Sequence, residues 1–275
     1  MPQTINTNTL SLNAQRNLSA SQSSLATSVQ RLSSGLRVNS AKDDAAGLAI
    51  SERMNAQVRG MNVAIRNAND GVSLAQTAEG AIGQISNMLQ RMRELAVQSA
   101  NATNSTGDRA NLNSEYQQLG LEINRTINGT KFNNKSILST DAGAQDFQVG
   151  ANAGDVVTIT TTNLSSDTDI SAVTSGDVTD VTNSNSALQN IDKALDKVNT
   201  ERANYGAVNA RFDSIIATLQ VASENQAASR GRIVDADFAQ ETANLSRTQI
   251  LQQAGSAMVA QANQAPQQVL QLLRG

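Results

Sequence analysis

One stretch decides the fold: LSASQSSLATSVQRLSSGL, residues 18–36. Its apolar side chains recur at steps of seven, four, three and four residues: Leu18, Leu25, Val29, Leu32 and Leu36. Steps of three and four place side chains on one face of a helix. The residues between them are mostly Ser, Gln, Thr and Ala, which are too small and polar to form a core. A helix of this kind needs a partner to cover its apolar face, so the stretch predicts an assembly surface.

The C-terminal end carries a weaker stripe of the same kind, consisting of Phe238, Leu245, Leu251, Met258, Ala262, Val269 and Leu273. Its spacing also predicts an amphipathic helix with little apolar surface of its own. We therefore expect the two ends of the chain to pair as a coiled-coil-like arm and to serve together as the assembly surface.

The composition predicts a long, thin bundle. Only 39% of the 275 residues are hydrophobic and 2% are aromatic, so large side chains contribute little burial. The two prolines, Pro2 and Pro266, lie near the ends, which leaves the residues between them free of the strongest helix breaker. We expect a mainly α fold, an elongated antiparallel helical bundle with a small β insert.

Missing residue types exclude whole classes of chemistry. The chain has no His and no Cys, which excludes Ser–His and Cys–His nucleophiles and zinc sites built on either residue. We expect no catalytic, cofactor-binding or metal-binding residues. With a net charge of −3 and no basic run, we expect no nucleic-acid partner. No apolar run is long enough to span a membrane, and none follows the first residues, so we expect no cleavable secretory signal. This fits a cytosolic protein or a signal-independent export route.

The middle of the chain predicts the bundle. Helical spacing runs from Ile50 to Leu95, from Leu112 to Ile127 and from Leu188 to Leu219, and the first run predicts a helix of about 55 residues. Alternating residues predict short strands at Phe147–Val149 and Val156–Thr162. We expect a terminal helical domain, residues 1–42 with 236–275, and a bundle domain, residues 43–235. The bundle domain includes residues 131–186, which we expect to form a β-hairpin insert followed by an exposed polar connector at residues 163–186.

Several blocks together resemble bacterial flagellin. They are LSSGLRVNSAKDDAAG at 32–47, RNANDG at 66–71, LQRMRELAVQS at 89–99, QVGAN at 148–152, QILQQAG at 249–255 and VLQLLR at 269–274. The chain is similar to a short flagellin that lacks the large outer variable domains. The resemblance implies a secreted homopolymer that forms the extracellular flagellar filament and drives swimming. It implies type III export with a cytosolic chaperone, and contacts with the filament cap and hook–filament junction proteins.

The resemblance also assigns residues. It implies that the terminal helices pack the inner tube of the filament through Leu18, Leu25, Val29, Leu32, Leu36, Phe238, Leu245, Leu251, Met258, Val269 and Leu273. It implies that Arg91, Leu95 and Glu115 contact the vertebrate innate receptor for flagellin, Toll-like receptor 5; the other interpretation is a subunit contact plus a solvated charge. Leu270, Leu272 and Leu273 are candidate contacts of the export chaperone, or they close the core of the inner tube.

Two alternatives remain at this point. A hook–filament junction protein would share paired terminal helices but would cap a filament instead of polymerising, and self-polymerisation distinguishes the two. An enzyme has no catalytic constellation in its support. We further expect residues 1–40 and 236–275 to be largely disordered in the monomer and to fold on assembly.

Overall fold

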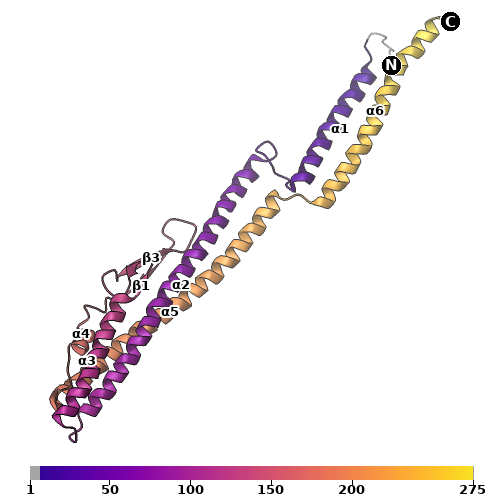
Figure 1. The fold of residues 1–275 in the computed structure, drawn as a ribbon. Coiled ribbons are helices and arrows are strands. Elements are labelled where there is room, and N and C mark those ends of the chain that lie inside the picture. The colour runs from indigo at the N-terminus through magenta and orange to yellow at the C-terminus, as the bar shows by residue number, and fades with distance from the viewer. Residues whose placement is uncertain (1–6, 275) are drawn as a thin grey trace. The chain divides into compact units, whose positions relative to one another are not determined.

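The computed structural model describes the backbone of residues 7–274 and the side chains of residues 7–264. The fold is mainly α with small β-hairpins, as the sequence predicts (Figure 1). The helices are α1 (Thr9–Ser34), α2 (Ala45–Ser99), α3 (Thr106–Gly129), α4 (Thr168–Thr174), α5 (Val181–Val234) and α6 (Phe238–Arg274). The strands are β1 (Lys131–Phe132), β2 (Lys135–Ser136), β3 (Ala144–Gln148) and β4 (Val156–Thr160).

The chain divides into two compact units. We call residues 1–56 with 225–275 the terminal unit, and residues 57–224 the central unit. Both boundaries fall inside the long helices α2 and α5, so each of these helices contributes residues to both units.

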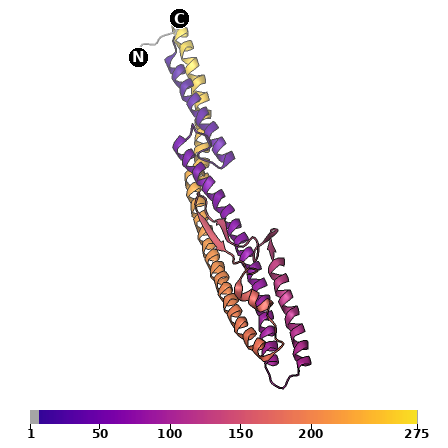
Figure 2. The same cartoon turned by 90° about the vertical axis from the view of Figure 1, so that its left-hand side faces the viewer.

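The central unit is a helical bundle with a continuous apolar core. The predicted helix of about 55 residues is confirmed, because α2 contains 55 residues. Its buried face packs with those of α3 and α5, which lie beside it in both views (Figure 2). The largest fully buried side chains of these three helices are Ile82, Ile85, Leu89, Met92, Leu95, Tyr116, Ile123, Ile127, Tyr205 and Phe212.

Two antiparallel hairpins make up the β insert. The β1–β2 hairpin turns through Asn133 and Asn134, whose φ angles of 47° and 65° lie in the left-handed region that Asn tolerates. In the second hairpin, Phe147 of β3 pairs with Val157 of β4. The Phe147 ring meets Phe212 of α5 edge to face, with centroids 5.9 Å apart. This aromatic pair fixes the second hairpin to the bundle.

The segment 163–186 is not the exposed connector that its polar composition predicted. It contains α4, whose N-cap Asp167 accepts hydrogen bonds from the amides of Asp169 and Ile170. Four of its apolar side chains are at most 1% exposed and belong to the core: Leu164, Ile170, Val173 and Val178. The prediction failed because the apolar side chains are few and irregularly spaced, yet these four are buried.

In the terminal unit, α1 and α6 run antiparallel and in contact. Near the chain ends, the Asn8 side chain donates to the carbonyl of Ala262 at 2.7 Å, and the Ser11 hydroxyl donates to Asn263 Oδ1 at 2.7 Å. At the other end, α1 stops at Gly35, which has a φ of 71°. This left-handed position is the usual helix C-terminus for glycine.

Backbone hydrogen bonds join the segment that follows α1 to the segment that precedes α6. Leu36 and Asp235 form an antiparallel β-bridge. The amide of Arg37 donates to the carbonyl of Val234 at 2.7 Å, and the amide of Ala236 donates to that of Gly35 at 2.9 Å. Val38 and Val234 are buried beside them, at 2% and 3% exposure. These hydrogen bonds join the end of α1 to the start of α6.

Candidate functional site

The seam between α1 and α6 has a heptad spacing. The facing positions are buried or half-buried and follow one another at alternating steps of three and four. This is the repeat of a coiled coil. The members are Ser11, Ala14, Leu18, Ser21, Leu25, Ser28 and Leu32 on α1, and Glu241, Leu245, Thr248, Gln252, Gly255, Val259 and Ala262 on α6.

Small or polar residues occupy nine of the fourteen positions of this seam. Leu18 lies against Gly255, where an added Cβ would be 3.2 Å from Leu18 Cδ1. The antiparallel register that this contact and the Ser11–Asn263 bond define places Leu25 opposite Thr248. The most buried members of the seam are all polar: Ser11, Ser28, Glu241 and Thr248, at 5–8% exposure. The pair is packed closely, but it buries little apolar surface.

Much of the predicted inner-tube stripe stays open in the single subunit. Leu18, Leu25, Leu32, Leu36 and Leu245 are half-buried. The more exposed members are Val29 at 50%, Leu251 at 49%, Phe238 at 57% and Met258 at 58%. Val269 and Leu273, like the candidate chaperone contacts Leu270 and Leu272, lie outside the residues whose side chains the structure describes.

Helix α6 carries a second heptad seam that none of the other described helices covers. Its members are exposed and again follow at steps of four and three: Arg247, Leu251, Ala254, Met258 and Gln261. Ile250, which is 66% exposed, lies beside it. We call this set the second seam of α6. The sequence stripe included Leu251 and Met258 but did not separate the covered seam from the open one.

The candidate receptor residues lie on the central unit, where α2 faces α3. The guanidinium of Arg91 contacts Glu94 at 2.9 Å and Glu115 at 2.8 Å. The hydrogen bonds that Arg91 donates to Glu94 and Glu115 stabilise its charged form and raise the pKa of Arg91. The side chains of Arg91 and Glu115 are 49% and 47% exposed, so both are accessible to a partner. The expectation for Leu95 is wrong, because its side chain is 1% exposed and lies in the core.

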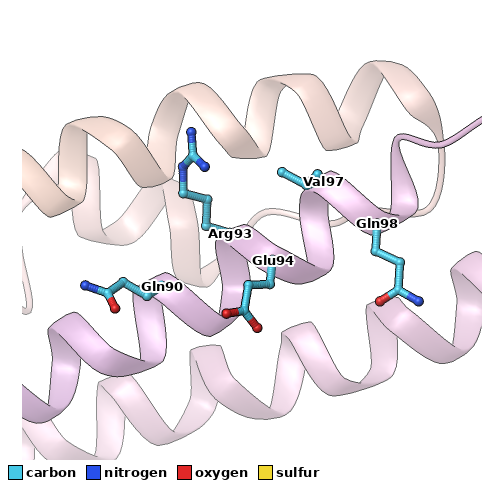
Figure 3. A pocket seen from close by; sticks show the side chains of 5 residues that line it. All are labelled: Gln90, Arg93, Glu94, Val97 and Gln98. Carbon is cyan, nitrogen blue, oxygen red and sulfur yellow. The ribbon is translucent and has the colours of Figure 1, made fainter.

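A shallow hollow runs along the same part of α2 (Figure 3). Gln90, Arg93, Glu94, Val97 and Gln98 line it. Val97 is 51% exposed, and Arg93 forms an ion pair with Asp192 of α5 at 2.8 Å. The sequence analysis missed Val97, although a large apolar residue outside the core stripe of α2 is the signal that could have found it.

Two family models match the chain. The model of the bacterial flagellin N-terminal helical region matches residues 5–143, and that of the C-terminal helical region matches residues 188–273. The chain belongs to the bacterial flagellin family. It is a structural, non-enzymatic subunit of the extracellular flagellar filament, which serves motility.

Full-length relatives agree with this assignment. The chain is 48% identical to a flagellin of Halalkalibacterium halodurans over 98% of this chain and 99% of the relative. It is 41% identical to a flagellin of Xenorhabdus nematophila, with 100% of both chains covered. These matches confirm the resemblance that the sequence blocks indicated.

Solved structures show the same helical architecture. The crystal structure of Bacillus cereus flagellin is 35% identical, with a TM-score of 0.51 over 56% of this chain and 88% of that one. The structure of a putative flagellar hook-associated protein from Vibrio parahaemolyticus reaches a TM-score of 0.56 over 70% of this chain and 100% of that one. At 16% identity, the second likeness shows a shared fold alone.

The described residues contain neither a candidate membrane span nor a candidate metal site. None of their helices combines the length and the apolar character needed to cross a bilayer. No group of three or more acidic side chains among them is placed to hold a metal ion.

Proposed function

We propose that the subunit polymerises head-to-tail through its terminal helix pair, and that a terminal helix of a second copy fills the second seam of α6. The exposed Leu251 and Met258 support this, because a heptad seam with apolar members is stabilised by burial against another helix. Head-to-tail contacts that do not close into a ring produce an open helical polymer.

The terminal pair becomes fully stable only within the polymer. Most of the stability of a helix in a protein comes from packing of its apolar face, and the seam between α1 and α6 buries mostly small and polar side chains. Residues 1–40 and 236–275 of the free monomer therefore exchange between ordered and disordered states. Limited proteolysis of dilute monomer should trim both ends and leave a resistant central fragment. Full protection of both ends would contradict this.

We assign residues 1–42 and 236–275 to the inner tube and residues 43–235 to the outer tube of the filament. Truncation tests the assignment directly. Chains lacking either terminal segment should form no filaments in electron micrographs after transfer from acid to neutral pH, whereas the whole chain should form long ones. Long filaments from either truncated chain would overturn the proposal.

A surface substitution tests the second seam more sharply. The Leu251→Gln/Met258→Gln variant alters two side chains that are 49% and 58% exposed, so the subunit should fold normally. Its critical concentration for polymerisation should rise at least about tenfold, since each apolar contact in a buried helix interface stabilises by about 1 kcal/mol or more. Val156→Gln, on the exposed side of β4, is the matched control and should polymerise as the wild type does.

The remaining filament partners follow from the family. We propose that a cytosolic export chaperone binds the C-terminal segment through Leu270, Leu272 and Leu273, and that filament cap and hook–filament junction proteins contact the ends of the polymer. Co-purification of the whole chain with the chaperone, set against the Leu270→Ser/Leu272→Ser/Leu273→Ser variant, tests the first contact. Equal binding of both chains would exclude these leucines.

We propose that host Toll-like receptor 5 recognises the surface around Arg91 and Glu115. Support comes from the exposure of both side chains and from their ion pair, which presents one fixed arrangement of charge at the α2–α3 boundary. Leu95 contributes to recognition indirectly, because its packing in the core positions the helix turn that carries Arg91.

Receptor signalling tests this surface. Arg91→Ala/Glu115→Ala should lower signalling in a reporter cell line by about tenfold or more, because charged groups at an interface contribute about 1.5 kcal/mol or more each when buried. Glu122→Ala/Arg125→Ala removes another exposed ion pair of α3 and is the matched control. Equal signalling by both variants would discard the proposal.

A further inference from the structure

Charged residues concentrate where the terminal helices meet the rest of the chain. Residues 31–53 and 229–247, which we call the charged joint, hold seven cations and six acids. Outside the joint, the terminal segments 1–30 and 248–275 hold only Arg16 and Arg274. All of the charged joint belongs to the terminal unit. Such a change in composition marks a surface that differs in function from the apolar helix seams.

These charges are not neutralised within the subunit. Every ion pair within 4.0 Å among the described residues lies in the central unit, such as Arg93 with Asp192. In the joint, Asp43, Asp44 and Asp237 instead accept hydrogen bonds from backbone amides at the helix starts. These acids thereby hold the local backbone and form no ion pair with a cation of the joint among the described residues.

Two guanidinium groups of the joint are incompletely satisfied. The Nε atoms of Arg31 and Arg230 are inaccessible to water and have no hydrogen-bond partner. A buried donor without a partner is destabilising. Lys42 and Arg53, in contrast, point their charges to solvent. The joint therefore holds both strained and freely available cations beside a nearly equal number of acids.

We propose that the charged joints of neighbouring copies form ion pairs with one another in the filament. The occupant of this surface is a second copy, because seven cations and six acids are almost self-complementary. A phosphate-rich partner would meet exposed carboxylates such as Glu52 and Asp235 on the same surface and be repelled. This inference rests on the proposed polymerisation and adds an electrostatic contact beside the apolar seam, which fixes the register of one copy along the next.

Charge reversal at exposed positions tests the joint. Lys42→Glu/Arg53→Glu changes two exposed side chains that make no contact needed for folding. Its critical concentration should rise at least about tenfold at about 0.02 M NaCl, and the difference should shrink to about twofold at about 0.5 M, where screening shortens electrostatic interactions. Lys131→Glu/Lys135→Glu, which reverses two exposed cations of the first hairpin, is the matched control.

Mixing identifies the partner. Glu52→Lys/Asp235→Lys reverses two exposed acids of the joint and should also polymerise poorly alone. An equal mixture of the cation-reversed and acid-reversed chains should form mixed filaments near the wild-type critical concentration. Wild-type assembly by each variant alone, with an unchanged dependence on salt, would overturn the ion-pair proposal while leaving polymerisation itself intact. If the wild-type chain did not polymerise, the proposed function would fail instead.

Discussion

The central and terminal units use the same helical periodicity with side chains of different size. In the central unit, the inward positions hold residues such as Ile85, Leu89 and Phe212, none of which is exposed. In the terminal unit, the facing positions of α1 alternate leucines with Ser or Ala, and those of α6 are mostly small or polar, such as Thr248 and Gly255. Within the described part of the terminal unit, the buried apolar side chains are Val38 and Val234, both at the joint.

The difference separates folding from assembly. Fully burying a large apolar side chain stabilises by about 1.5–3 kcal/mol, so the central unit gains most of its stability within one chain. The terminal pair leaves Leu251 and Met258 exposed, and we propose that contact with other copies buries them. On this proposal, the terminal pair is loose in the monomer and becomes rigid in the polymer.

The largest effect on this contrast should come from truncating the core of the central unit. Phe212→Ala removes a fully buried ring that meets Phe147, and should lower the free energy of unfolding by about 3–5 kcal/mol. Tyrosine fluorescence during denaturant unfolding is the measurement, because both tyrosines, Tyr116 and Tyr205, belong to the central unit.

The matched substitution in the terminal unit is Leu251→Ala. This side chain is 49% exposed in the subunit, so the same fluorescence transition should move by less than about 0.5 kcal/mol. Equal losses for the two variants would show that both units share one cooperative core and would break the comparison.

Two glycines of α2 should respond with opposite signs. At Gly71 an added Cβ would lie 2.8 Å from the Phe212 ring, so Gly71→Ala should destabilise the central unit by about 1–3 kcal/mol. At Gly80 nothing lies within 4 Å, so Gly80→Ala should stabilise it by up to about 1 kcal/mol through helix propensity. Denaturant midpoints distinguish the two variants. A loss of stability for Gly80→Ala would contradict the open space around Gly80.

Alkaline pH should weaken the central unit selectively. Burial raises the pKa of Tyr116 to about 12, and it also raises the pKa of Tyr205. The ordinary tyrosine pKa is about 10, so the stability from the neutral phenols is complete below about pH 10 and is lost as the pH rises through the folded-state values.

Tyrosinate absorbance checks this sign. Ionisation in the native protein should lag behind that of free tyrosine until the central unit unfolds. Tyr116→Phe should lose less stability over the same interval, although the carbonyl of Val173 then lacks its 3.1 Å hydrogen bond. Free titration at the ordinary pKa with the fold intact would contradict the burial argument.

The long elements could be read from the sequence because their apolar stripes are regular. The stripe from Ile50 to Leu95 predicted α2, and the alternation at Val156–Thr162 predicted β4. The segment 163–186 was misjudged because four isolated apolar residues in a polar segment carry no period, and their burial depends on the surrounding helices. Spacing alone cannot supply that tertiary information.

The candidate sites also divide into those that the sequence could predict and those that it could not. Leu95 belongs to the apolar stripe together with Met92, three residues earlier, and that spacing already indicated a core position. The open seam of α6 could not be separated from the covered one, because the facing positions of α1 and α6 depend on their register. That register is set by contacts between residues more than two hundred positions apart, such as Ser11 with Asn263.

The smallest effect is expected at the closest contact of the terminal pair. Gly255→Ala places a Cβ at 3.2 Å from Leu18 Cδ1, which is tight, but Leu18 is half-buried and its side chain can move. The gain in helix propensity of about 1 kcal/mol and the crowding therefore nearly cancel. Hydrogen exchange of α6 in the monomer should change by less than about fivefold. Gly255→Leu, which Leu18 cannot accommodate by rotating, should separate the helices and speed that exchange strongly. If Gly255→Ala also sped the hydrogen exchange of α6 strongly, the pair of α1 and α6 would be packed as rigidly as the central unit. Its seam would then be a complete core without other copies.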